Sequence, residues 1–422
     1  GLFRPEYTGE GENGNFYPEC YIIPLDGENQ SNLQAAYDMM TWLSRNDVKI
    51  LVTEQPVTVD GVTYPAGTMI ISMYQAKRSV ANGALYDGTF ITDWTDLYSE
   101  GITSFAATRG FDMVTVTKPA VYKTVSAACG SWMGYDDCKL YVAANKGTYF
   151  TGKHGADVVI SNASEDSTAA VNALLQAGKT VGMVTDAQSS FYGDFICSYA
   201  DFLTIADKFT VSATGISQKD AGYPAATTIS KAPVVYITGA AGKNSSGFVY
   251  TNQVSSASNW NYDRCAMELM GFETTTDISA ATGIIGASIG YGRSGVSSVG
   301  KLIGAARSSA SGMDCLGYVT YPTTTLVNAS YVVDCDDILY GYGLGWFSEI
   351  PEGAQVLVQM DGTKTPTEGF INAITDSQKE LMNTYLNNSV QGFQYQGADT
   401  EGNQVNVVLF ANSLTNKVHQ RD

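Results

Sequence analysis

Apolar residues in the N-terminal part of the chain recur with two different spacings. In 32–44 they fall three and four residues apart, as on one face of an amphipathic helix, at Leu33, Ala36, Met39, Met40 and Leu43. Short apolar runs at 20–24, 48–53 and 69–73 predict strands, and 75–83 begins another helix. In 57–67, alternating positions flank Asp60 and Gly61, a pair typical of a tight β-hairpin. This part therefore predicts a small α/β lobe that carries a hairpin.

Apolar runs and helical patterns continue to alternate along the rest of the chain. Runs at 139–143, 157–161, 180–185 and 195–199 predict strands, and 167–177 predicts a helix that ends at Gly178. The polar stretch 212–232, which contains Gly and Pro, predicts a connection. Further strands are predicted at 233–239, 316–320, 329–334, 355–359 and 405–410, with a helix at 262–270.

Strands separated by helical stretches predict an α/β fold with parallel sheets flanked by helices. The chain has 422 residues, enough for two to three lobes of Rossmann or flavodoxin type beside the small hairpin-bearing lobe. The predicted divisions are a linker or arm at 1–16, an N-terminal lobe at 17–118, a middle lobe at 119–227 and a C-terminal lobe at 228–422.

Charge and composition limit the partners. The formal net charge is −18, which repels phosphate backbones and argues against a nucleic-acid partner. The apolar runs fall short of the roughly 20 residues of a membrane-spanning helix, so no membrane insertion is expected. Charged residues make up only 16% of a chain rich in Gly and Tyr, a composition common in secreted or cell-surface bacterial proteins.

Cysteine and histidine usage bears on metal chemistry. The seven cysteines include no CxxC pair, which argues against a zinc ribbon or a thioredoxin-type site. Cys129 and Cys138 lie close in sequence, and a local disulfide and two separate thiols are both open. The two histidines, His154 and His419, are far apart, whereas a catalytic zinc site usually takes three protein ligands and often two imidazoles. No metal or other cofactor is therefore expected in this chain.

A glycine-rich stretch carries two short motifs. Ser288 stands in a G-x-S-x-G sequence, the turn that exposes the nucleophile of many serine hydrolases, and His419 lies downstream. The same stretch contains Gly290-Tyr-Gly292-Arg-Ser-Gly295, a G-x-G-x-x-G match, but Asp314 does not take the place of the ribose-binding acid. Chance matches are common where Gly, Ala and Ser abound. A small-residue turn is the favoured interpretation, and a serine hydrolase built on Ser288 stays an alternative.

Two further groups of residues are candidates for binding. Three acidic residues at the end of a predicted strand could hold a hard cation such as calcium, although without EF-hand spacing a solvated loop is the commoner arrangement: Asp334, Asp336 and Asp337. Aromatic residues could line a peptide or glycan groove, although core packing is their commoner fate. The leading ones are Trp260, Tyr262 and Trp346. An extracellular peptide- or glycan-binding module is thus a second alternative.

Several segments, in order along nearly the whole chain, carry a resemblance to a known family. They are YIIPLDGENQSNLQAAYDMMTWLSRNDVKI with TVDGVTYPAGTMIISMYQAKR, STAAVNALLQAGKTV followed by GDFIC, PVVYITG with NYDRCAMELMGF, YVVDCDDILYGYGLG, and NVVLFANSLTNKVHQRD. Together they resemble the long C-terminal, non-zinc region of bacterial carboxypeptidase A-like zinc metallopeptidases. Gln75 and Arg78 match that family's Gln-x-x-Arg.

The resemblance implies lobes of the class I glutamine amidotransferase type, without amidotransferase catalysis, because no cysteine stands in a glycine-flanked elbow. The family's His-x-x-Glu pair and distant third zinc ligand have no counterpart here. The resemblance therefore implies a non-catalytic accessory region that supports peptide or cell-wall processing. Its partner would be the zinc peptidase domain of the same polypeptide, upstream of this chain, and zinc would be bound only there.

Overall fold

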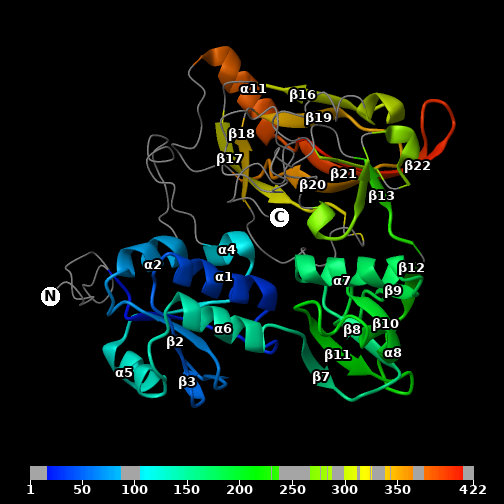
Figure 1. The fold of residues 1–422 in the computed structure, drawn as a ribbon. Helices are drawn as coiled ribbons and strands as arrows, with labels where there is room; N and C mark the ends of the chain where they lie inside the picture. Colours follow the sequence, from blue (N-terminus) through cyan, green and yellow to red (C-terminus); the bar gives the residue numbers. More distant parts are fainter. Residues whose placement is uncertain are drawn as a thin grey trace, which may run out of the picture. The chain divides into compact units, whose positions relative to one another are not determined.

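The computed structural model describes residues 17–86, 105–229, 231–236, 267–275, 277–282, 284–287, 299–310, 314–323, 325, 338–342, 344–364 and 375–411. They fall into two compact units (Figure 1). The first takes in the described residues up to Thr228, except for 175–178, and the second takes in those four residues and the described residues from Ile229 onward.

The first sheet of the first unit is antiparallel throughout. Its strand order is β2 (Leu51–Val52), β5 (Met69–Ser72), β1 (Cys20–Ile23) and β6 (Val114–Val116). Around it lie α1 (Leu33–Arg45), α2 (Arg78–Leu85), α4 (Phe105–Arg109), α5 (Pro119–Ala127), α6 (Tyr135–Asn145) and the hairpin of β3 (Val57–Val59) and β4 (Val62–Tyr64).

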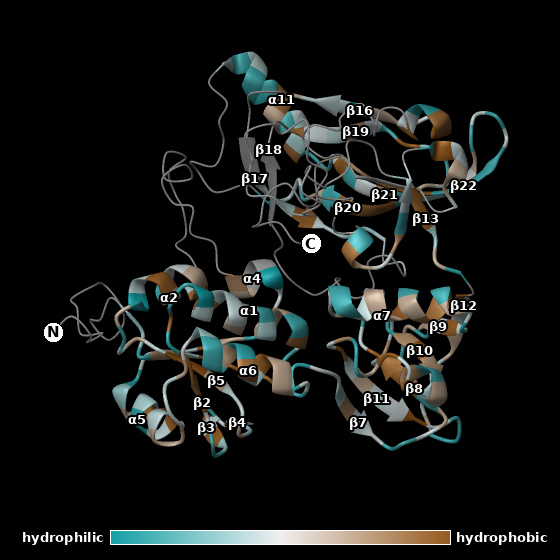
Figure 2. Cartoon of the chain, in the orientation of Figure 1, coloured by the Kyte–Doolittle hydropathy of each residue, from teal (hydrophilic) through white to brown (hydrophobic). Residues whose placement is uncertain are grey.

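Alternation along β1 builds a core on each face of this sheet. Tyr21 and Ile23 pack with the apolar faces of α1, α2 and α6, whereas Cys20 and Ile22 pack with the hairpin and α5. Successive side chains of a strand point to opposite faces, so four fully buried residues feed two separate clusters. Figure 2 shows the resulting concentration of hydrophobic residues on these strands.

Two local predictions for this region hold. The 32–44 pattern forms α1, whose N-cap Asn32 accepts a hydrogen bond from the backbone N–H of Ala35 at 3.0 Å. The hairpin turns at Asp60 and Gly61, which have φ of 48° and 87°. Two central residues with positive φ match the right-handed twist of the paired strands, as the Asp-Gly sequence predicted.

The second sheet of the first unit has six strands. The order is β12 (Ala226–Ile229), β9 (Val181–Val184), β10 (Phe195–Ser198), β8 (Asp157–Ile160), β11 (Ser212–Ile216) and β7 (Tyr149–Gly152). The β10–β9, β10–β8 and β11–β8 pairs are antiparallel, and β11–β7 is parallel. Helix α7 (Glu165–Gln176) buries Ala170 and Leu174 and is followed by Gly178 at φ 73°, as predicted, and α8 (Tyr199–Phe202) follows β10.

The second unit is built on an eight-stranded sheet. Its main path is β15 (Ile284–Ala287), β22 (Gln404–Phe410), β21 (Val390–Ala398), β20 (Gln355–Met360), β17 (Asp314–Thr320) and β18 (Ile338–Tyr342), with β16 (Ala306–Ser309) and β19 (Gly345–Glu349) attached. Strands β13 (Val234–Tyr236) and β14 (Glu273–Thr275) form a separate parallel pair, and a 3₁₀ turn, η2 (Ile278–Ala280), follows. Helix α11 (Asp376–Leu386) packs Met382 and Tyr385 into the core.

The predicted parallel-sheet, Rossmann- or flavodoxin-like lobes are wrong. The described sheets are mostly antiparallel, and the described parallel pairs are β11–β7, β13–β14 and β15–β22. An apolar run reports that a strand is buried, but it carries no information about the direction of its partner. Two local predictions also fail: 139–143 lies inside α6, and the supposed connection 212–232 contains β11 and β12. The lobe boundaries drawn from the sequence stay predictions.

Candidate binding surface

Most residues proposed from sequence motifs lie outside the described part of the chain. These are Ser288, Asp334, Asp336, Asp337, Trp260, Tyr262 and His419. Their proposed roles stay predictions. Within the described residues, no helix combines the length and apolarity needed to span a membrane. The same residues contain no group of three or more His, Cys, Asp or Glu placed to hold a metal ion.

Trp346 is described, and it is a core residue. Its side chain is 8% exposed and lies edge-on to Tyr385, with 6.2 Å between the ring centroids. Met360 and Met382 belong to the same cluster. The indole is thus used for packing β19 against α11, and it does not line an exposed groove.

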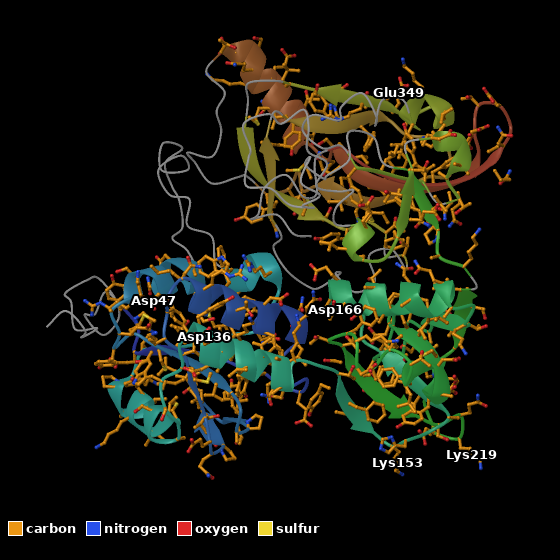
Figure 3. All side chains as sticks on the ribbon, in the orientation of Figure 1. Asp47, Asp136, Lys153, Asp166, Lys219 and Glu349 are labelled. Atoms are coloured by element: carbon orange, nitrogen blue, oxygen red, sulfur yellow. The ribbon has the colours of Figure 1, made fainter. Side chains whose placement is uncertain are left out.

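His154 lies at the surface of the second sheet. Its ring stacks on Phe150 at a centroid distance of 5.3 Å, and its Nδ1 shares a hydrogen bond with the hydroxyl of Tyr199. Tyr199 also lies edge-on to the imidazole, at 5.2 Å. Figure 3 labels the neighbouring Lys153 at the outer end of this sheet. These contacts account for the histidine as an exposed residue held by aromatic neighbours.

Four cysteines, Cys20, Cys129, Cys138 and Cys197, are free thiols, so the Cys129–Cys138 disulfide left open by the sequence is not formed. Burial raises the pKa of both of these thiols to about 11, and that of Cys197 to about 12. The pKa of Cys20 rises further, again chiefly through burial. Thiols with raised pKa values are weak nucleophiles at neutral pH, so these four act as small hydrophobic residues.

The residues that match the family's Gln-x-x-Arg make scaffold contacts. The Gln75 side chain is 6% exposed, accepts a hydrogen bond from the Lys49 N–H at 2.8 Å, and donates to the carbonyls of Lys49 at 3.0 Å and Ser72 at 2.8 Å. It thereby ties the turn after β5 to the segment that enters β2. The Arg78 guanidinium lies 4.7 Å from the centroid of the Tyr17 ring.

The surface that stands out lies where the chain runs along the free edge of β2. Residues 128–133 run antiparallel to 50–54, with paired positions Thr53–Cys129 and Ile50–Met133. Backbone bonds join Gly130 N–H to Val52 O at 3.0 Å and Met133 N–H to Ile50 O at 2.8 Å. From Cys129 to Met133 the chain advances by four residues, whereas the facing segment from Ile50 to Thr53 advances by three. The extra residue makes a β-bulge, a device that re-aims side chains at sheet edges.

This bulge and the start of α6 each present one aromatic side chain to solvent. We call residues 129–135 the aromatic edge. Trp132 is 45% exposed and Tyr135, the first residue of α6, is 39% exposed. Met133 between them packs into the core shared by α1 and α6, and this packing fixes the backbone on the core side. Exposed large aromatics on a fixed backbone are typical of binding surfaces, because little conformational entropy is lost when a ligand covers them.

Charged residues surround the aromatic edge. Lys49 Nζ pairs with Asp47 at 3.4 Å and lies beside Gly134. The Asp137 carboxylate accepts a hydrogen bond from the Gly134 N–H at 3.0 Å at the start of α6. Asp136 is exposed one residue earlier, and Figure 3 labels it together with Asp47. At the other end of the edge, the Glu54 carboxylate lies against Gly130.

Sequence reasoning missed this surface. From the sequence, this stretch indicates only a possible disulfide between Cys129 and Cys138. The available signal was SWMGYDD, two aromatics among small and acidic residues. Its meaning depends on the pairing with 50–54, which no local pattern indicates.

Comparison with known proteins adds no relative. No protein-family model matches the chain, and neither the curated proteins nor the solved structures contain a significant match.

Proposed function

We propose that this chain is the non-catalytic accessory region of a secreted, carboxypeptidase-like bacterial zinc metallopeptidase. In this proposal its aromatic edge holds an extended peptide, and a zinc domain outside this chain hydrolyses it. The observation that carries the peptide-binding part of the proposal is the exposure of Trp132 and Tyr135 on a backbone fixed by the packing of Met133, and the metallopeptidase part follows the sequence resemblance. The zinc expected for the reaction would be bound entirely by that other domain.

The use made of the family-like residues supports an accessory role. Gln75 is buried, and both its amide oxygen and its amide nitrogen are hydrogen-bonded to backbone groups. The Arg78 guanidinium lies over the Tyr17 ring. The N-terminal blocks of the resemblance thus supply β1, α1, the hairpin and β5, which form the two cores of the first sheet. Residues committed to packing are suited to supporting a surface rather than to carrying out proton transfer.

The test measures zinc content and carboxypeptidase activity in two proteins: this chain alone, and a version extended upstream to include a zinc domain. We expect only the extended protein to hold zinc and release C-terminal residues. A Trp132→Ala variant of the extended protein should show a higher KM with little change in kcat, because the surface binds substrate without touching the scissile bond. Stoichiometric zinc or hydrolysis by the chain alone would contradict the proposal.

A further inference from the structure

We infer that the aromatic edge recognises a basic side chain, an arginine or lysine, in the peptide that it binds; this rests on the proposed function. Two exposed carboxylates flank the edge. Glu54 reaches Gly130 at one end, and Asp136 follows Tyr135 at the other. Trp132 lies between these ends, because the backbone of Glu54 bonds to Ala128 at 2.7 Å and Met133 bonds to Ile50.

The other charges of the edge are already engaged. Lys49 is paired with Asp47, so its ammonium is partly neutralised. Asp137 accepts a hydrogen bond from the Gly134 N–H and also interacts favourably with the partial positive charge at the start of α6. Within the described part of the chain, Glu54 and Asp136 have no ion-pair partner. The edge therefore offers two carboxylates and an exposed indole ring to a ligand.

This combination suits a cation and disfavours an anion. A guanidinium or ammonium group is attracted to the face of an aromatic ring, most strongly to that of Trp. While it stacks on a ring, a guanidinium group can also pair with a carboxylate that lies in the guanidinium plane. The formal net charge of −18 adds a long-range field that attracts basic segments and repels acidic ones. A neutral sugar could stack on Trp132, but it would leave the carboxylates without a charged partner.

The experiment compares two fluorescent peptides of identical sequence, one with a single central arginine and the other with citrulline, the neutral isostere. Binding is measured by fluorescence anisotropy at about 50 mM and about 500 mM salt. We expect the arginine peptide to bind about 5-fold to 10-fold more tightly at low salt, from one cation–π contact and one exposed ion pair, and the preference to shrink at high salt.

Three variants separate the contributions. Trp132→Ala should weaken both peptides, and Asp136→Asn should reduce only the preference for arginine. Asp207→Asn removes the same charge from an exposed position in the turn between α8 and β11, so it is the matched control for the overall field and should leave the preference intact. Circular dichroism checks that each variant is folded.

The outcomes distinguish the two proposals. Equal binding of the arginine and citrulline peptides would overturn the basic-residue preference and leave peptide binding in place. Binding of neither peptide would overturn both proposals. A preference that falls as much in Asp207→Asn as in Asp136→Asn would overturn the local recognition, because it would come from net charge alone. A neutral oligosaccharide that displaces the arginine peptide more tightly than unlabelled peptide does would overturn the choice of ligand.

Discussion

Replacing Gln75 with alanine tests whether the family-like glutamine is a scaffold residue. The change removes three hydrogen bonds, of 2.8, 3.0 and 2.8 Å. It leaves the Lys49 N–H without its Gln75 acceptor at a site where Gln75 is only 6% exposed. A net contribution of about 1 kcal/mol per bond gives a loss of about 3 kcal/mol. Gln75→Met fills most of the volume without these bonds, so it should lose nearly as much.

Hydrogen exchange suits this measurement, because it reports the opening of the first sheet separately from the second unit. A loss of about 3 kcal/mol lowers the protection of slow amides in β1 and β5 by about 100-fold. Amides of β21 and β22, in the other unit, should be unaffected. Lys77→Ala, at an exposed position two residues away, is the control and should change stability by less than about 0.5 kcal/mol. A decrease below about 3-fold for Gln75→Ala would refute the scaffold role.

Three further predictions concern single sites. Burial raises the pKa of Asp194 to about 6, so the folded state loses stability as pH rises from about 4 through 6. In urea titrations, Asp194→Asn should therefore stabilise the protein by about 2 kcal/mol at pH 7.5 and very little at pH 4. Gly61 has φ 87° with open space around it, so Gly61→Val should cost about 1 to 2 kcal/mol through backbone strain alone, seen as a lower Tm, whereas an unchanged Tm would contradict the turn assignment. Cys20 and Cys129 should react with a disulfide reagent at pH 7.4 at least about 10-fold more slowly in the folded than in the denatured protein, as followed by peptide mapping; equal rates would show that the thiols are accessible.

The sequence predicts those elements whose structure is settled within a few residues. The spacing of Leu33 to Leu43 gives α1, and Asp60-Gly61 gives the hairpin, because one helix face or one turn suffices to define each. The stretch 139–143 fails for a related reason. Its run Leu-Tyr-Val-Ala looks like a strand, but the residues that reach the core are Cys138, Tyr141 and Val142, at helical spacing, and Leu140 is 70% exposed.

Strand β11 shows what a single sequence hides. Its Ser, Ala, Thr and Gly residues resemble a polar connection, yet the strand lies inside the second sheet between β8 and β7. Small residues are needed there, since a Cβ on Gly215 would lie 1.9 Å from the carbonyl oxygen of Lys153. The requirement comes from a chain segment about sixty residues away, so neither propensity nor periodicity expresses it.

The aromatic edge has the same dependence on distant residues. Judged by residue type alone, Trp132 and Tyr135 would be expected in a core, as Trp346 would, and Trp346 is in fact buried. What separates Trp132 from Trp346 is one extra residue between Cys129 and Met133 relative to the facing segment, whereas Tyr135 follows as the first residue of α6. Exposure of an aromatic is therefore a property of the pairing register. Deleting Ser131 would restore equal spacing between the paired positions, and it should abolish peptide binding even though both aromatic residues remain in the sequence.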